Sequence, residues 1–290
     1  MPLLITGATG RLGRLVVEQL LAAGVPAGDI VATGRATDKI KDLADRGVQV
    51  RAVDFGDPAA VRAAVAGADR LLLVSAMEPG GRVALHRNVI DAAREAGTGL
   101  AAYTSIVNAG TTTIRLAADH QATEQLLRDS GVPYVLLRNS WYHENYTDRL
   151  PAFLAQGAIP GSVGEGRISA AARADYAAAA VRVLTTDGHV GQAYELGGNE
   201  AFTLAQLAAE ISARSGREIR YVNLPAAKYA DTLKTHGVPE LMADMVAETD
   251  AAAAHGALYT ASGDLTTLIG RPATTLSAAV GAALSALDGS

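Results

Sequence analysis

The sequence predicts an α/β protein, with a doubly wound parallel sheet followed by a smaller C-terminal α/β lobe. Short apolar runs alternate with stretches of helical length through the first half of the chain, and glycines follow most of those stretches. A run such as Leu71-Leu72-Leu73-Val74 has no polar face, which is typical of a strand covered on both sides. Strands that alternate with helices form right-handed βαβ units, and such units build a parallel sheet.

The expected sheet lies in the first half of the chain. Its strands are expected at residues 3–6, 30–34, 48–53, 71–74, 100–104 and 134–138. Its helices are expected at residues 11–23, 38–46, 58–66, 82–96 and 116–130, where apolar residues recur at helical spacing. Gly24, Gly47 and Gly97 follow helices, as expected where the chain turns left-handed before the next strand.

Past residue 140 the alternation becomes irregular. A helix is expected over residues 142–156, a glycine-rich loop over 157–166 and an alanine-rich helix over 173–185. We therefore predict a sheet domain over residues 1–141 and a smaller substrate-binding lobe over residues 142–290. Some segments of the lobe are expected to return to the sheet.

The composition excludes several classes of function. The 290 residues include no cysteine, which removes disulfides, thiolate nucleophiles and cysteine-ligated metals. The six histidines lack the spacing of a ligand set, so no metal is expected. No apolar run is long enough to cross a membrane, and the net charge of −5 argues against a nucleic-acid partner. The chain start has no secretory pattern, so a cytoplasmic protein is expected.

A glycine pattern between the first strand and the first helix predicts a dinucleotide site of the Rossmann-like kind. Gly7, Gly10 and Gly13 are spaced three apart, which permits a tight turn and a close approach of the backbone to a pyrophosphate. The cofactor contacts expected here are Gly7, Thr9, Gly10, Arg11 and Leu12. The alternative is a glycine-rich turn that binds nothing.

The end of the second strand indicates which dinucleotide would bind. Arg35 stands where a site for NADH usually has an acidic residue, and an arginine suits the 2′-phosphate of NADPH. The alternative is a solvated loop arginine. Asp54 and Phe55 follow the third strand and could contact the adenine, or they could belong to a turn that caps the next helix.

Further cofactor contacts are expected where the fourth and fifth strands end, because ligands of open parallel sheets bind at the carboxyl ends of strands. These candidates are Ser75, Ala76, Met77, Tyr103, Thr104 and Ser105. A Tyr-x-x-x-Lys proton relay, usual in short-chain dehydrogenases, is absent, since none of the nine tyrosines has a lysine four residues later.

The catalytic candidates are His120, Asn139 and Tyr142. His120 and Glu124 lie four residues apart on an expected helix, so Glu124 could orient His120, or the two could form an ordinary surface pair. Asn139 ends the sixth strand and could bond the nicotinamide carboxamide. Trp141, Tyr142 and Tyr146 form the chain's densest aromatic cluster, which could line a substrate pocket or anchor a core.

These residues together resemble the NmrA-like atypical short-chain dehydrogenases and reductases, most closely their NADPH-dependent quinone oxidoreductase type 2 group. Triphenylmethane reductase is a more distant look-alike. The resemblance is carried by Ile5-Thr6-Gly7-Ala8-Thr9-Gly10-Arg11-Leu12-Gly13, Ala102-Tyr103-Thr104-Ser105, Leu137-Arg138-Asn139 with Trp141-Tyr142, and Glu144-Asn145-Tyr146. It implies NADPH along the glycine turn and Arg35, and a quinone near Asn139 and Tyr142. The sequence departs from the family at Gly34-Arg35-Ala36-Thr37, where Val-Arg-Asn-Pro is more usual.

Two functions of different classes follow from this. The first is an NADPH-dependent reductase that transfers a hydride to a quinone or a similar planar acceptor, and the absent Tyr–Lys relay suits it because a reduced quinone oxygen is only weakly basic. The second is a non-catalytic NAD(P)-binding redox sensor of the NmrA type. The aromatic cluster favours the enzyme, and a homodimer is left open.

Overall fold

The computed structural model describes residues 1–76, 78, 80–112 and 114–289, and it divides them into two compact units. Unit 1 comprises Met1–Ile106, Asp119–Asn139 and Arg173–Tyr194, and unit 2 comprises Val107–Ala118, Ser140–Ala172 and Glu195–Ser290. The main change of unit falls between Asn139 and Ser140, two residues before the predicted boundary. The alanine-rich helix α8 (Arg173–Thr185) belongs to unit 1.

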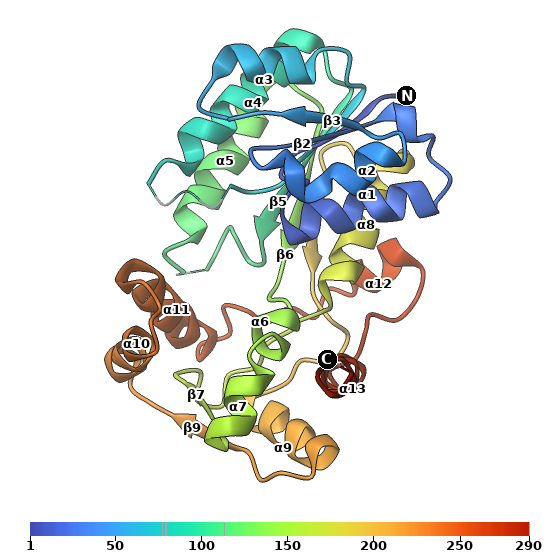
Figure 1. The fold of residues 1–290 in the computed structure, drawn as a ribbon. Coiled ribbons are helices and arrows are strands. Elements are labelled where there is room, and N and C mark those ends of the chain that lie inside the picture. Colours follow the sequence, from blue (N-terminus) through green and yellow to red (C-terminus); the bar gives the residue numbers. More distant parts are fainter. Residues whose placement is uncertain (77, 79, 113, 290) are drawn as a thin grey trace. The chain divides into compact units, whose positions relative to one another are not determined.

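Unit 1 contains the parallel sheet that the sequence predicts, as far as Tyr194 in its last strand (Figure 1). Among the described residues the sheet has seven strands in the order β3-β2-β1-β4-β5-β6-β8. Neighbours from β3 to β6 pair in parallel. The strands are β1 (Leu3–Ile5), β2 (Ile30–Gly34), β3 (Gln49–Ala52), β4 (Arg70–Leu73), β5 (Leu100–Ile106), β6 (Tyr134–Asn139) and β8 (Ala193–Leu196). This is a doubly wound, Rossmann-like order, because the chain runs outward from β1 in both directions.

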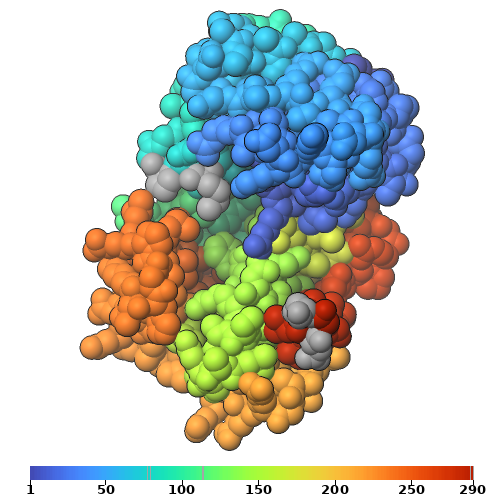
Figure 2. All heavy atoms as spheres, viewed as in Figure 1, coloured from blue at the N-terminus to red at the C-terminus, as the bar shows by residue number. Residues whose placement is uncertain are grey.

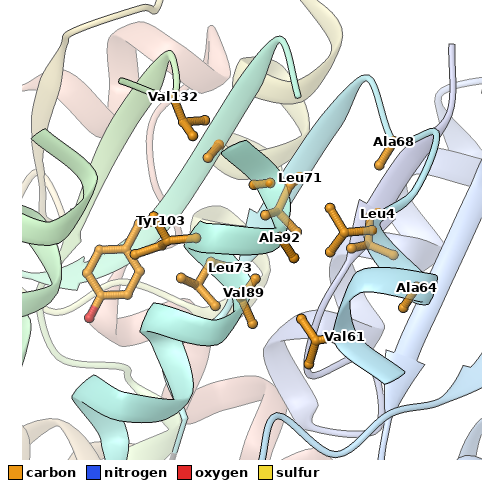
Figure 3. Close-up of a cluster of buried hydrophobic side chains, with 14 of the residues drawn as sticks. Leu4, Val61, Ala64, Ala68, Leu71, Leu73, Val89, Ala92, Tyr103 and Val132 are labelled. Atoms are coloured by element: carbon orange, nitrogen blue, oxygen red, sulfur yellow. The ribbon is translucent and has the colours of Figure 1, made fainter. Parts of the chain in front are cut away.

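Helices cover both faces of this sheet, as its apolar strands require. On one side α1 (Arg11–Ala22) packs beside α8, and on the other α3 (Pro58–Val65) packs beside α4 (Arg82–Ala96) (Figure 1). Figure 3 shows the second face, where Leu4, Leu71 and Leu73 of the strands meet Val61 and Val89 of the helices. The helix α5 (Ala117–Ser130) contributes Leu127 to the same core.

Apart from shifts of about one residue at element ends, unit 1 differs from the predicted elements chiefly in two places. The predicted helix over 38–46 is a 3-10 turn, η2 (Thr37–Ile40), that leads into the short helix α2 (Lys41–Asp45). The fifth strand runs to Ile106 instead of ending at residue 104, because it stays paired with β6 as far as Asn139. A second 3-10 turn, η1 (Ala27–Asp29), leads into β2.

Unit 2 is mostly helical and holds a second, two-stranded parallel sheet formed by β7 (Ala158–Gly161) and β9 (Arg220–Asn223). The predicted glycine loop over 157–166 is thus partly a strand, and the predicted helix over 142–156 is two helices. The helices of this unit are α6 (Glu144–Thr147), α7 (Leu150–Gln156), α9 (Leu204–Ser215), α10 (Ala226–Thr235), α11 (Glu240–Ala253), α12 (Asp264–Ile269) and α13 (Leu276–Asp288).

The helices α10 and α11 pack together around a small apolar core of their own, which includes Tyr229, Leu233 and Ala243. Their surface is the orange region of Figure 2. Over the described part of the chain, no helix combines the length and the apolar character that a membrane crossing requires.

Candidate dinucleotide and acceptor site

The glycine turn brings the chain back against the sheet before α1 begins. Gly7 has a φ of +61°, a conformation that glycine adopts without strain. The Ala8 amide donates to the Thr33 carbonyl at 2.8 Å, and the Gly10 amide donates to the Gly7 carbonyl at 2.9 Å. A Cβ added at Gly13 would lie 2.7 Å from the Gly7 carbonyl carbon, so only glycine lets α1 start this close to the turn.

The start of α1 is suited to an anion. No side chain caps this helix at Gly10, and its first turn carries no acidic residue. The first-turn amides and the helix dipole therefore offer positive potential to a pyrophosphate. Gly10 and Arg11 are exposed there, whereas Leu12 is buried, so Leu12 could meet a ligand chiefly through its backbone.

Thr9 lies against the end of β2. A Cβ added at Gly34 would lie 2.5 Å from the Thr9 hydroxyl oxygen, so the glycine at position 34 leaves room for the Thr9 side chain. This gives a physical reason for the glycine at position 34, where the family more usually has valine, because a valine there would displace Thr9.

Arg35 is exposed at the end of β2. Its guanidinium forms an ion pair with Glu78 at 2.8 Å, and its side chain is 70% exposed. The exposed side chain can reach a ligand, but a phosphate bound there would have to replace Glu78 as the partner of the guanidinium.

The end of β3 forms a turn, which is the alternative that the sequence allowed for Asp54 and Phe55. The Asp54 carboxylate accepts from the Gly56 amide at 2.9 Å, and Asp57 caps α3 by accepting from the Ala59 and Ala60 amides. Phe55 is half-buried against the core of unit 1. An adenine contact by Asp54 or Phe55 stays a prediction.

The end of β4 is held by side chains from two neighbouring elements. The Ser75 amide donates to the Thr104 hydroxyl of β5 at 2.9 Å. The Ala76 amide donates to His86 Nε2 at 3.0 Å, and its carbonyl accepts from Arg82 Nε at 2.6 Å. Both backbone groups of Ala76 are thus fixed by α4. Met77, the next cofactor candidate, lies outside the described residues.

His86 itself is fully buried and carries no charge. Burial, assisted by the nearby Arg82, lowers its pKa to about 3. Because Nε2 accepts from Ala76, the ring proton is on Nδ1, which donates to the Thr123 hydroxyl at 2.9 Å. The Thr123 hydroxyl in turn donates to the Asp119 carbonyl at 2.9 Å. This chain of bonds ties the end of β4 to α5.

His120 and Glu124 share a face of α5, as predicted, but they are neither a surface pair nor bonded to each other. His120 is 6% exposed and Glu124 is 2% exposed. His120 Nδ1 lies 2.8 Å from the Tyr103 hydroxyl. The idea that Glu124 orients His120 is therefore wrong, because the Glu124 carboxylate is held by other residues.

Glu124 is the centre of a buried ion-pair cluster. Arg138 of β6 binds both carboxylate oxygens, at 2.9 and 2.7 Å, and the Ser105 hydroxyl of β5 donates to one of them at 2.7 Å. Arg128 adds a further contact at 2.8 Å. Burial alone would raise the pKa of Glu124, but the bonds from Arg138 and Ser105 outweigh it and the pKa is lowered. The Ser105 hydroxyl is therefore bonded to Glu124, and its expected contact with the cofactor stays a prediction.

Tyr103 does not reach a ligand with its side chain. The ring is wholly buried in the core of unit 1, and Figure 3 shows its oxygen at the far end from Leu73 and Val89. A direct cofactor contact by this side chain, as predicted from the sequence, does not agree with its burial. Its hydroxyl is bonded to His120 instead.

Asn139, the last residue of β6, carries an unused hydrogen-bond acceptor. Its side chain is 6% exposed, and its buried Oδ1 has no hydrogen-bond partner among the described residues. A buried carbonyl oxygen without a donor costs free energy, so it calls for a partner supplied from outside the chain. An amide donor such as a nicotinamide carboxamide fits this position.

The aromatic cluster of Trp141, Tyr142 and Tyr146 belongs to unit 2. Trp141 and Tyr142 are half-buried, and the Trp141 carbonyl accepts from the Ala171 amide at 3.2 Å. Tyr146 is 8% exposed and packs edge-on against Phe202 with 6.0 Å between ring centres. The core-anchor alternative therefore suits Tyr146, because its ring is closed off from solvent.

Three residues of the site were not anticipated from the sequence: Arg82, His86 and Arg138. Arg138 carried a usable signal, since a charge inside the apolar strand Leu136-Leu137-Arg138 must find a buried partner. Arg82 and His86 lie four apart at the start of α4, but nothing local indicates that both hold Ala76.

The fold and the glycine turn define a dinucleotide-binding α/β protein. A family model described as NAD(P)H-binding matches residues 7–187. Quinone oxidoreductase 2 of Escherichia coli is 49% identical over 276 residues, which cover 95% of this chain and 96% of that protein. The chain belongs to the NmrA-like NAD(P)H-binding family, as the sequence resemblance implied.

Solved structures agree with this assignment. The crystal structure of the NADPH-dependent quinone oxidoreductase QOR2 of E. coli, complexed with NADPH, matches with a TM-score of 0.94 and 48% identity, covering 97% of this chain and 99% of that one. Triphenylmethane reductase of Citrobacter sp., complexed with NADP(H), matches with a TM-score of 0.93 and 36% identity over 97% of this chain and 99% of that one.

Proposed function

We propose that this protein is an NADPH-dependent reductase that transfers a hydride to a quinone or a similar planar acceptor. The observation that carries the proposal is the likeness to E. coli quinone oxidoreductase 2, at 49% identity across almost the full length of both chains. The triphenylmethane reductase of Citrobacter sp., whose dye substrates are also conjugated, supports the breadth of the acceptor class.

The residues of unit 1 fit NADPH. The pyrophosphate would lie at the start of α1, over Gly7, Thr9, Gly10, Arg11 and Leu12. Arg35 would exchange Glu78 for the 2′-phosphate, and the Asn139 Oδ1 would accept from the carboxamide. Bound NADPH would supply the hydride from its nicotinamide ring.

The protein's contribution is then orientation and a donor for the developing oxygen anion. Ala76, held through both of its backbone groups, would support the nicotinamide from the end of β4. His120, in the first turn of α5, would donate a hydrogen bond to the acceptor. Trp141 and Tyr142 are proposed as acceptor contacts on the sequence pattern. A neutral donor suffices, because the anion of a hydroquinone is far less basic than an alkoxide.

The test is NADPH oxidation followed by absorbance with a simple benzoquinone, repeated with NADH. Quinone-dependent oxidation that prefers NADPH is expected. Binding of both NADP⁺ and NADPH without turnover of any quinone or dye would contradict the proposal and favour a redox sensor. We also propose a cytoplasmic location, which fractionation of cells would test. Light scattering would test whether the protein is a homodimer, which the sequence leaves open.

A further inference from the structure

Tyr103 and His120 form a pair that the sequence pattern did not indicate. Tyr103 lies on β5, and His120 lies in the first turn of α5, the helix that follows this strand. The phenol oxygen and His120 Nδ1 are 2.8 Å apart, and both side chains are more than nine-tenths buried. In a parallel sheet, the helix after a strand starts near the carboxyl edge, where ligands bind. The pair therefore runs from the core of unit 1 toward that edge.

The geometry decides which nitrogen of His120 carries the proton. Burial raises the pKa of Tyr103 to about 12, so the phenol keeps its hydrogen. Burial and the charge of Arg82 lower the pKa of His120 to about 3, so the imidazole is neutral. A buried phenol donates its hydrogen to the acceptor at bonding distance, which is Nδ1. The ring proton of His120 is consequently on Nε2.

The charged groups around the pair leave Nε2 available. The Glu124 carboxylate is held by Arg138 and Ser105, and Asp119 faces Arg82 at 3.9 Å. No hydrogen bond joins Nε2 to any residue within the described ranges. His86, the second imidazole nearby, is engaged at both nitrogens by Ala76 and Thr123. Of these two neighbouring imidazoles, only His120 thus presents an N–H group that no described residue bonds.

We propose that Tyr103 is a positioning residue, whose hydroxyl holds His120 in the Nε2–H form so that the imidazole donates a hydrogen bond to the oxygen of the acceptor. The proposal rests on the quinone reductase function given above. Hydride addition to a quinone gives the hydroquinone monoanion, and water then supplies the single proton that completes the hydroquinone. Tyr103 and His120 keep their protons throughout, and a neutral imidazole can act as such a donor. In the other tautomer, a lone pair on Nε2 would face the growing negative charge.

The decisive variant is Tyr103→Phe, which keeps the ring and removes only the hydroxyl. We expect quinone turnover (kcat) to fall about tenfold, the size of one lost neutral hydrogen bond, with the Kd for NADPH unchanged within twofold. The matched control is Tyr194→Phe. Tyr194 makes the same kind of bond to His189 Nδ1, also at 2.8 Å, but it lies on the edge strand β8, and its loss should leave turnover unchanged.

Two further measurements separate positioning from a structural effect. Nitrogen-15 NMR of histidine-labelled protein should show the His120 proton on Nε2, with Nδ1 accepting a hydrogen bond that disappears in Tyr103→Phe. In a His120→Ala background, Tyr103→Phe should cause no further loss of rate, because the two residues act as one unit.

Three results would each overturn the proposal. The first is a His120 proton on Nδ1, and the second is an unchanged rate in Tyr103→Phe. The third is a Tyr103→Phe change that lowers the rate of His120→Ala as much as it lowers the rate of the unaltered protein. The NMR result does not depend on turnover. If the protein reduces no quinone yet His120 has its proton on Nε2, the proposed function fails while the inferred tautomer stands, and the donor role to a quinone falls with the function.

Discussion

The glycine turn and the buried polar network of α4 and α5 lie at the same edge of one sheet, but they are built from different parts of the chain. The turn is made by neighbouring residues and uses backbone groups, with Gly7, Gly10 and Gly13 giving access to the start of α1. The network joins β4, β5 and β6 to two helices through the side chains of His86, Tyr103, His120, Glu124 and Arg138.

The difference shows how each region tolerates change. A backbone site needs only that no side chain intrudes, so its sequence requirement is for small residues. In a network of buried polar groups each member must keep its bonding partner, because an unpaired charge or donor in the interior lowers the stability of the folded protein. We therefore expect the network to be the more fragile of the two regions, and the following experiments test that expectation.

The largest effect is expected at Glu124. Glu124→Gln leaves Arg138 and Arg128 facing a neutral amide, and removing one partner of a buried ion pair costs about 3–5 kcal/mol. Urea unfolding would measure this loss. Glu210→Gln is the control, because Glu210 also pairs with an arginine four residues later but at the surface, and it should change stability by less than about 1 kcal/mol. Equal losses in both variants would contradict the comparison.

Asn139→Ala should mainly impair turnover. Loss of the carboxamide contact lets the nicotinamide shift, and a misplacement of about 1 Å can cost on the order of a hundredfold in rate. NADPH binding should weaken much less, since the phosphates hold the rest of the cofactor. Tyr142→Phe should cost less turnover than Asn139→Ala. Steady-state rates and fluorescence titrations with NADPH would check both, and unchanged turnover in both variants would place the acceptor elsewhere.

The network should also make stability fall as the pH falls. Each of His86 and His120 has a folded pKa of about 3 against an unfolded value of 6.5, so below pH 6.5 the unfolded chain binds more protons and gains stability. At pH 5 this costs about 2 kcal/mol per histidine.

Asp250 of unit 2 opposes this trend, because burial raises its pKa from 3.8 to about 6 and the folded chain binds its proton first. Unfolding by urea at pH 7 and at pH 5 should show a net loss of about 2–3 kcal/mol. Asp250→Asn should make the loss steeper. A stability that does not change between these pH values would contradict the burial of the neutral imidazoles.

In the glycine turn the sensitive position is Gly13. Gly13→Ala places a methyl group against the Gly7 backbone, and such overpacking costs about 1–3 kcal/mol. NADPH binding should weaken in parallel, because the start of α1 must move. Gly28→Ala is the control, since nothing lies within 4 Å of the added Cβ. Thermal unfolding and NADPH titration measure both effects, and a Gly13→Ala protein that matches Gly28→Ala would show that the turn is not closely packed.

The smallest effect is expected at Arg35. Its guanidinium is exposed, so an exchange of Glu78 for a 2′-phosphate should favour NADPH over NADH by about tenfold. Arg35→Ala should weaken NADPH binding and leave NADH nearly unchanged, and added salt should narrow the gap. Equal affinities of the unaltered protein for NADH and NADPH would refute this role of Arg35.

The sheet could be predicted from the sequence because its signals are local. Apolar runs give strands, helical spacing gives the covering helices, and the alternation of the two gives βαβ units and a parallel sheet. The errors in unit 1 lie at element ends, as at Ile106, where pairing with β6 extends the strand beyond its apolar run. The elements of unit 2 could be predicted less well from the sequence, because its short strands β7 and β9 pair with each other although they lie far apart in the chain.

By itself, the sequence determined the parallel sheet, the glycine turn and the position of Asn139 at a strand end, because each depends on residues close together in the chain. Only the tertiary structure decided the partners of the buried polar groups. The spacing on α5 made Glu124 the expected partner of His120. In the structure the Glu124 carboxylate is instead bound by Arg138 of β6, and His120 is bonded to Tyr103 of β5. Which buried polar side chains pair depends on their distances and charges in the folded protein, and these distances cannot be read from any short segment of the sequence.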